Sequence, residues 1–252
     1  MTNTSISENQ VMDSHSPFEI DGQTILITID GPAGAGKTTI SRCLAGKLGY
    51  RYLDTGALYR AIAWAIHHAG LNPDSENDSR IEAFLKTLLL QTDCTKNLDT
   101  VVRVNGRDVS AHIRSPEIAM LASAISAKPA VRRYLLELQQ EIGRPGGVVC
   151  EGRDMGTVVF PHADIKFYLD ASIEIRARRR LRELPDNSGM CLEDLISQIQ
   201  QRDQADSTRE IAPLKMPDDA ILIDSSNLDI DGVIARMEGH LRALTQNRAI
   251  WR

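Results

Sequence analysis

The chain contains 252 residues, of which 42% are hydrophobic and 25% charged, and its formal net charge is −5. This composition predicts one globular α/β domain large enough to carry an inserted subdomain. The acidic balance argues against a duplex nucleic acid or a membrane surface as partner, and no apolar stretch reaches the length of a membrane span. Residues 1–22 are polar and acidic without a signal-peptide core, so we expect a disordered tail before a single domain over 23–252.

Cysteine usage indicates the compartment. The four cysteines, Cys43, Cys94, Cys150 and Cys191, have neither the spacing of a metal site nor a CxxC motif. Widely separated cysteines of this kind are typical of thiols in a reducing cytosol. We therefore expect a cytoplasmic protein without a disulfide framework.

The first predicted strand leads into a glycine-rich loop. The apolar run Thr24–Ile29 precedes Gly-Pro-Ala-Gly-Ala-Gly-Lys-Thr at residues 31–38. This spacing matches the P-loop, whose backbone N–H groups cradle the phosphates of a nucleoside triphosphate. Lys37 is placed to reach the β- and γ-phosphates, and Thr38 to ligate magnesium at the start of a helix over Thr39–Leu48. The alternative, a plain glycine-rich turn, explains neither the strand before the loop nor the helix after it.

Short β-rich runs alternate with helical patterns, which predicts a parallel sheet covered by helices on both faces. The five runs are Thr24–Ile29, Tyr50–Leu53, Gly147–Cys150, Ile165–Leu169 and Ala220–Ile223. The acids that follow them are Asp30, Asp54, Glu151, Asp170 and Asp224. Ligands of such sheets bind at the carboxyl ends of the strands, so these acids are candidate site residues, although each could instead cap the next helix.

The alternation stops between residues 71 and 117. Two short strand-like runs flank Asn105-Gly106, the strongest short-range signal for a hairpin, so we expect a small antiparallel insertion here. Helices are predicted afterwards at Glu117–Lys128 and Val131–Ile142, with a proline between them.

Two arginines lie close behind predicted strands. Arg60 stands in the first helical turns after Asp54, where its guanidinium can fork onto a monophosphate; the alternative is a surface arginine on an amphipathic helix. Arg153 and Asp154 follow the third strand, after Gly152, which allows close approach of a ligand. The alternative for this neighbouring pair is a local ion pair.

Two later helices also carry arginines. A helix is predicted over Ala171–Leu184, with its charged side opposite its buried side. The charged side carries Arg176, Arg179 and Arg180, and the buried side Ala177, Leu181 and Leu184. A second helix over Leu192–Ala205, if extended, places Arg202, Asp206 and Arg209 on one face. Either set could be a solvated charged face, and the first could be a nucleic-acid patch, which the acidic balance weakens.

Four further segments decide the second substrate. They are Leu53-Asp-Thr-Gly-Ala-Leu-Tyr-Arg60, Glu151-Gly-Arg-Asp-Met-Gly-Thr-Val-Val-Phe-Pro161, Arg176-Ala-Arg-Arg-Arg180, and Arg202-Asp-Gln-Ala-Asp-Ser-Thr-Arg209 running into Ile211-Ala-Pro-Leu214. With the P-loop they resemble bacterial cytidylate kinases, in the same order, from about Ile25 to Ser225. A P-loop alone also occurs in GTPases, motor ATPases and other small-molecule kinases.

The resemblance implies a P-loop kinase fold. Its parts are a five-stranded parallel sheet flanked by helices, a small antiparallel insertion in the region that binds the nucleoside monophosphate (NMP), and a helical lid. The implied boundaries are a core over about 23–54, 118–175 and 202–252, an NMP-binding region over about 55–117 and a lid over about 176–201. The implied partners are the small molecules CMP and dCMP, with no nucleic acid and no membrane, and the chain is expected to be a monomer.

The resemblance also assigns roles to matching residues. For ATP these are Gly31, Pro32, Ala33, Gly34, Ala35, Gly36, Lys37, Thr38, Thr39, Arg176, Arg179 and Arg180, with Thr38 also ligating Mg²⁺. For the acceptor they are Thr55, Arg60, Arg153 and Arg209 at the monophosphate, Ser123, Arg132 and Asp154 at the base, and Arg202 and Asp206 at the pentose. The catalytic set is Lys37, Arg153, Arg176, Arg180 and Arg209.

The base-reading set suits cytosine. A carboxylate faces the 4-amino group and Arg or Ser donors face the acceptors N3 and O2, whereas uracil would place a carbonyl against Asp154. Ala33, Thr55 and Glu151 depart from the family's commoner Ser, Ser and Asp, and the loop tolerates Ala33 because it works through backbone N–H groups. Ser123 lies in an Ala/Ser-rich helix, where simple close packing is an alternative.

Two other functions remain open. One is a kinase for another small acceptor, such as adenylate, and Asp154, Arg132 and the inserted hairpin weigh against it. The other is a nucleotide-switch GTPase, and the absence of an Asn-Lys-x-Asp guanine-reading motif weighs against that.

Overall fold

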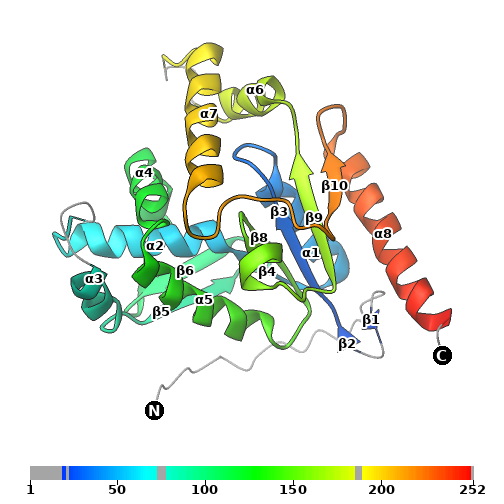
Figure 1. Ribbon diagram of the computed structural model, residues 1–252, viewed down its shortest axis with the longest axis horizontal. Helices are drawn as coiled ribbons and strands as arrows, with labels where there is room; N and C mark the ends of the chain where they lie inside the picture. The colour runs from blue at the N-terminus through cyan, green and yellow to red at the C-terminus, as the bar shows by residue number, and fades with distance from the viewer. Residues whose placement is uncertain (1–18, 21–22, 73–77, 185–188, 251–252) are drawn as a thin grey trace.

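The computed structural model describes residues 19–20, 23–72, 78–184 and 189–250. A five-stranded sheet lies at its centre, in the order β10-β9-β3-β8-β4, and every neighbouring pair is parallel (Figure 1). The strands are β3 (Leu26–Asp30), β4 (Arg51–Asp54), β8 (Val148–Gly152), β9 (Ile165–Asp170) and β10 (Ile221–Asp224). The predicted sheet is confirmed, and each predicted acid is one of the last two residues of its strand.

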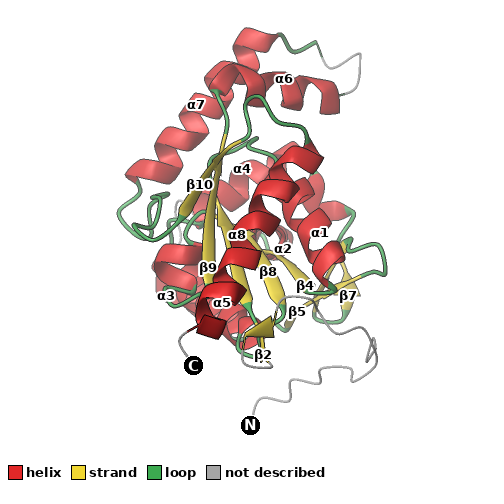
Figure 2. Cartoon of the chain, turned by 90° about the vertical axis from the view of Figure 1, so that its right-hand side faces the viewer, coloured by secondary structure: helices red, strands yellow, loops and turns green. Residues whose placement is uncertain are grey.

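Helices cover both faces of the sheet, because side chains alternate along each buried strand. Val149 packs with α1 (Lys37–Leu48) and α8 (Ile230–Ile250), whereas its neighbours Val148 and Cys150 pack with the opposite layer. That layer contains α2 (Thr55–His68), α4 (Pro116–Ile125) and α5 (Pro129–Gly143). Figure 2 shows α1 and α8 together on the near side of the strands. The two cores hold the strand ends, and therefore the site, in fixed positions.

The predicted insertion is confirmed but is larger than expected. A three-stranded antiparallel sheet contains β5 (Leu90–Cys94), β6 (Thr100–Val104) and β7 (Arg107–Asp108). Asn105 and Gly106 form the turn with φ values of 50° and 80°, as a tight hairpin requires. Strand β5 and helix α3 (Asp78–Leu85) were not predicted.

Several boundaries differ from the sequence predictions. Proline begins α4 and α5, since its missing N–H costs nothing in a first helical turn. Thr24 belongs to a short antiparallel pair, β1 (Glu19–Ile20) with β2 (Gln23–Thr24), and not to the first parallel strand. Within the expected disordered tail, residues 19–20 form β1, and the remainder, residues 1–18 and 21–22, lies outside the described residues.

Helices α6 (Ile173–Glu183) and α7 (Leu192–Thr208) stand beyond the carboxyl ends of the strands, and the predicted lid, about 176–201, falls within these two helices and their connection (Figure 1). They share a small core of Ala177, Leu195 and Ile199. The predicted buried side of α6 is wrong at Leu181, which is 36% exposed, and Arg176 is buried in its place. The core that α6 shares with α7 reaches only part of α6, and the N-terminal part of α6 packs against the P-loop. There Arg176 donates a hydrogen bond to the Ala33 carbonyl of the loop.

Gly31 provides a test of this packing. Its φ is 149°, and an added Cβ would lie 2.0 Å from the Leu169 carbonyl oxygen. Gly31→Ala should therefore lower the free energy of unfolding by about 2 kcal/mol or more, measured by urea denaturation. Gly239→Ala is the control, because this exposed position in α8 has nothing within 4 Å and should gain about 1 kcal/mol from helix propensity. Equal stability of Gly31→Ala and wild type would contradict this close approach of the loop and the strand.

Candidate active site

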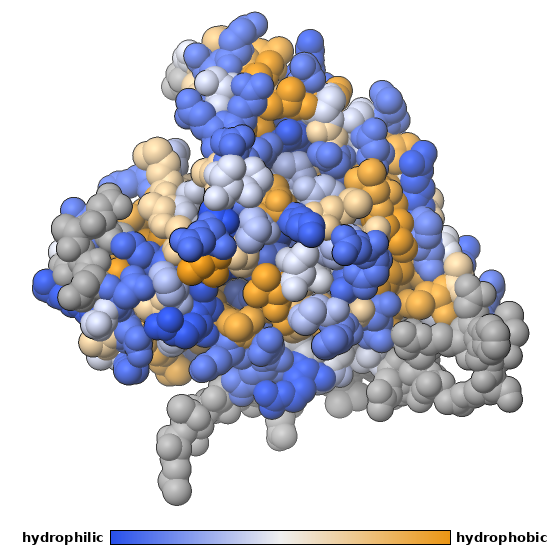
Figure 3. Space-filling view, in the orientation of Figure 1, coloured by the Kyte–Doolittle hydropathy of each residue, from blue (hydrophilic) through white to orange (hydrophobic). Residues whose placement is uncertain are grey.

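The candidate active site lies at the carboxyl edge of the sheet, between the lid and the region of α2 and α4 (Figure 1). In the space-filling view the surface is indented between these parts, and the side chains exposed there are mostly hydrophilic (Figure 3). The P-loop joins β3 to α1 here. Gly34 and Gly36 have φ values of 76° and 91°, and Gly36 begins α1 without a side-chain cap. The N–H groups of the first helical turn are therefore not taken by a capping side chain, which suits a phosphate.

Lys37 is buried at the base of the P-loop, where its Nζ donates to the Pro32 carbonyl at 2.7 Å. Burial lowers the pKa of Lys37 well below its ordinary value, and Arg153 adds to this effect. The carboxylates of Glu151 and Asp30 oppose it. An ammonium group between cations and anions in a desolvated place is suited to stabilising added negative charge.

Glu151 is buried beside this lysine, and two neighbours fix it. Tyr52 donates its phenolic O–H to the carboxylate, and Thr55 Oγ1 donates to the Glu151 carbonyl at 2.6 Å. Burial raises the pKa of Glu151, and a hydrogen bond from Thr38 lowers it. Thr38 itself is exposed at the start of α1. The predicted magnesium ligand and the strand-end carboxylate are therefore neighbours.

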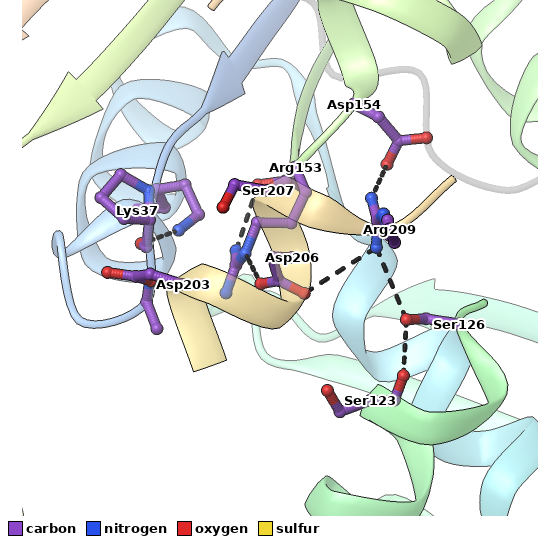
Figure 4. Close-up of polar contacts among 12 residues, drawn as sticks. Lys37, Ser123, Ser126, Arg153, Asp154, Asp203, Asp206, Ser207 and Arg209 are labelled. Carbon is purple, nitrogen blue, oxygen red and sulfur yellow. Dashed lines mark hydrogen bonds and ion pairs between the residues drawn. The ribbon is translucent and has the colours of Figure 1, made fainter. Parts of the chain in front are cut away.

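Asp154 holds two arginines that are far apart in the sequence. Its carboxylate accepts from Arg132. It also accepts from Arg209 Nη2 at 3.4 Å (Figure 4). All three side chains are less than 10% exposed. Charge-assisted hydrogen bonds in such a buried place keep the guanidinium planes oriented.

Ser126 completes this cluster and was not predicted. Its Oγ lies 3.5 Å from Arg209 Nη1, its carbonyl accepts from Arg132 Nη1 at 3.0 Å, and its hydroxyl donates to the Ser123 carbonyl (Figure 4). Ser123 is thus brought to the edge of the cluster, half-buried on α4. The Ala/Ser-rich sequence of this helix gives no signal that distinguishes the two serines.

The arginines predicted for the acceptor phosphate have different surroundings. Arg153 Nε donates to Asp206 at 2.8 Å, and Arg60 Nη2 donates to Asp54 at 3.1 Å. Arg202 is exposed and makes no hydrogen bond or ion pair with another described residue. The alternative of a local ion pair between Arg153 and Asp154 is absent from the contacts of the described residues, because the two side chains have separate partners.

The three lid arginines do not share one environment. Arg176 is buried and bonded to Asp203 and to the Ala33 and Ala171 carbonyls. Arg179 donates to the Ala35 carbonyl and to Ser225. Arg180 is exposed and pairs with Glu183 at 3.0 Å. The predicted single charged side, opposite the buried side, is therefore wrong for Arg176, and the alternative of a solvated face fails for Arg176 and partly for Arg179, because the P-loop packs against the N-terminal part of α6.

Comparison with known proteins shows the family. The family model described as cytidylate kinase matches residues 27–242. The chain belongs to the cytidylate kinase family. A cytidylate kinase of Geobacter sulfurreducens is 46% identical over 223 residues, covering 86% of this chain and 93% of that protein. One of Syntrophotalea carbinolica is 46% identical over 215 residues, covering 84% and 90%.

A longer relative carries the same region. The bifunctional pantoate ligase/cytidylate kinase of Synechococcus sp. (strain WH7803) is 44% identical over 220 residues, which is 86% of this chain and 44% of that protein. The predicted family and fold class are confirmed, and the chain is a phosphotransferase. Among the described residues, no helix is long and apolar enough to cross a bilayer.

The residues present fit a phosphate-bound magnesium ion. No group of three or more His, Cys, Asp or Glu side chains in the described ranges could enclose a metal. Mg²⁺ in kinases usually keeps several waters and binds substrate phosphates with one or two protein ligands. The exposed Thr38 hydroxyl and the adjacent Glu151 carboxylate match that requirement.

Asp30 supplies a pH test of the site. Burial raises the pKa of this carboxyl to about 6, against the effect of hydrogen bonds from the N–H groups of Gly156 and Met155. Because the native value lies above the unfolded 3.8, its contribution to stability is full below about pH 3.8 and is lost as the pH rises through about 6.

Carboxyl ¹³C NMR should therefore show Asp30 titrating near pH 6. Asp224 is the internal control, because hydrogen bonds from Ser226 lower its pKa below the ordinary 3.8. Titration of both carboxyls below pH 3.8 would show that Asp30 is better solvated than the structure indicates.

Proposed function

We propose that the protein transfers the γ-phosphoryl group of ATP to cytidine monophosphate, giving CDP and ADP. The observation that carries this proposal is the buried cluster in which Asp154 is shared by Arg132 and Arg209. This cluster offers one hydrogen-bond acceptor, the Asp154 carboxylate, and several arginine donors, and its burial excludes most water. Family membership supports the reaction class, and the cluster supports the base.

The monophosphate of the acceptor binds to Thr55, Arg60, Arg153 and Arg209 in this proposal. A guanidinium has five N–H donors, so an arginine paired with one carboxylate still has donors for a phosphate. Arg153 uses Nε for Asp206 and Nη1 for the Gly152 carbonyl, and its Nη2 makes no hydrogen bond with another described residue. Asp206 therefore orients the Arg153 guanidinium and leaves its Nη2 available to bind a phosphate.

The base binds to Asp154, with Arg132 and Ser123 as donors. Cytosine offers a 4-amino donor to the carboxylate and acceptors at N3 and O2 to the arginine. Ser126 fixes Arg132 through its carbonyl, so the arginine presents its donors from one direction. Uracil places a carbonyl against the carboxylate, and such a mismatch in a closed pocket costs about 1–3 kcal/mol.

The pentose binds to Arg202 and Asp206. Asp206 is buried and already accepts from Arg153, and its second oxygen lies 3.8 Å from Arg209 Nη1. A carboxylate held by two arginines retains lone pairs for a sugar hydroxyl. We propose that both CMP and dCMP are substrates, since the phosphate and base contacts do not require a 2′-hydroxyl.

ATP binds through residues 31–39, with Arg176, Arg179 and Arg180 on the lid side. The acceptor phosphate oxygen is already anionic near neutral pH, so no general base is needed. Lys37, Arg153 and Arg209 neutralise charge on the transferred group, and the lid excludes water. Mg²⁺, held at Thr38 and the ATP phosphates, supplies further charge neutralisation.

We also propose how the chain is divided into functional parts and where in the cell the protein acts. We assign the core to about 23–54, 118–175 and 202–252, the NMP-binding region to about 55–117, and the lid to about 176–201, which contains most of α6 and the first part of α7. We propose that the chain acts as a monomer. Cys43 and Cys191 are exposed free thiols, which suits the cytoplasm.

Asp154→Asn tests the assignment of the base. The amide keeps the size of the carboxylate but can donate to the 4-carbonyl of uracil, so CMP efficiency should fall far more than UMP efficiency. We expect the ratio of the two kcat/KM values to fall by about tenfold, the effect of one charged contact. Steady-state kinetics with both nucleotides measures this ratio.

Asp218→Asn is the matched control for charge, because this exposed carboxylate has no partner among the described residues and should leave the ratio unchanged. If Asp154→Asn lowers both efficiencies by the same factor, Asp154 only holds Arg132 and Arg209 and does not read the base. That outcome would refute the proposed cytosine contact.

A further inference from the structure

One residue of the P-loop is bound on both of its backbone polar groups by side chains of α6 and α7. The Ala33 N–H donates to Asp203 Oδ1 at 3.0 Å, and the Ala33 carbonyl accepts from Arg176 Nη1 at 2.9 Å. The same arginine donates to Asp203 Oδ2 at 2.5 Å and, through Nε, to the Ala171 carbonyl at 3.0 Å. Asp203 lies on α7 and Arg176 on α6, so three segments meet in one ring of contacts.

This ring differs from ordinary surface ion pairs. The Arg176 side chain is 9% exposed and that of Asp203 20%, whereas the Arg180 and Glu183 side chains nearby are 54% and 63% exposed. Exposed pairs contribute little because water and salt screen them, but a partly buried, charge-assisted pair resists rearrangement. The ring is therefore a rigid connection between the loop and the lid.

The connection also sets the direction of the loop's N–H groups. Arg176 binds the carbonyl of residue 33, and Arg179, one helical turn later, binds the carbonyl of residue 35 at 3.2 Å. In a trans peptide the C=O of one residue and the N–H of the next point in opposite directions. Drawing the carbonyls of 33 and 35 toward α6 thus turns the N–H groups of Gly34 and Gly36 away from it.

We propose that Asp203 is a positioning residue for the phosphoryl donor. Its carboxylate orients Arg176 and binds the Ala33 N–H, so that the P-loop has its phosphate-binding shape before ATP arrives. Asp203 is assigned no contact with either substrate, and it acts only through the loop and Arg176. The inference deepens the proposed function, on which it rests, and it specifies the ATP side of the site.

Two variants separate the roles of the carboxylate. Asp203→Ala removes both contacts, whereas Asp203→Asn keeps an oxygen that can accept from the Ala33 N–H but loses the charge that holds Arg176. Glu174→Gln is the matched control, because Glu174 is an exposed carboxylate in the first turn of α6 with no partner in the part of the chain that the structure describes. The three proteins are compared with wild type for KM of ATP, KM of CMP, kcat and melting temperature.

We expect Asp203→Ala to raise the KM for ATP by about tenfold, the effect of one charged hydrogen bond, and Asp203→Asn to raise it by a smaller factor. KM for CMP should stay within about twofold in both, since the contacts of Arg153 and Asp154 are untouched. Glu174→Gln should match wild type throughout. In an Arg176→Ala background, Asp203→Ala should add little, because the two residues act as a unit.

A lower melting temperature with an unchanged KM for ATP would show that Asp203 only stabilises the fold, and would overturn the proposal. Should Asp203→Ala fail to fold, the same criterion applies to Asp203→Asn. Equal increases in KM for ATP and for CMP would also overturn it. Equilibrium dialysis of ATP without an acceptor keeps the test separate from the choice of CMP, because it measures the donor site alone.

Discussion

The site depends on buried guanidinium groups that are each held by a carboxylate. Arg132 and Arg209 share Asp154, Arg153 is bound to Asp206, and Arg176 is bound to Asp203. An unpaired buried cation would be costly, and several cations within one site would repel each other. The carboxylates remove both problems, and because each guanidinium has five donors, pairing leaves hydrogen-bonding capacity for anionic ligands.

Because of this pairing, different carboxylates orient the arginines on the acceptor side and on the P-loop side of the site. Asp154 and Asp206 orient the arginines on the acceptor side, whereas Asp203 orients the arginine that contacts the P-loop. Lys37 lies near the strand-end carboxylates Asp30 and Glu151. Catalysis of phosphoryl transfer requires alignment and charge neutralisation more than covalent chemistry, so side chains with fixed orientations are the main contribution of this protein.

The sequence predicted what local patterns specify. The strand before the P-loop, the acids at the strand ends and the Asn105-Gly106 turn all depend on residues near each other in the chain. The burial of Arg176 could not be predicted, because helical periodicity places it with Arg180, and only the packing of α6 on the P-loop separates them. Ser126 and Asp203 were missed for a similar reason: the contacts of Ser126 with Arg209 and of Asp203 with Ala33 and Arg176 join segments distant in sequence, and their residue types are common on helix surfaces.

The most direct measurement is the rate of ADP release from ATP and Mg²⁺ with each of CMP, dCMP, UMP, AMP and GMP, and with no acceptor. A site with one carboxylate facing the base and arginine donors beside it should give the highest kcat/KM with CMP and dCMP. The kcat/KM with UMP should be lower than that with CMP by about tenfold or more, which is the effect of one mismatched charged contact. Equal efficiency with CMP and AMP, or ADP release that does not depend on an acceptor, would contradict this account of the site.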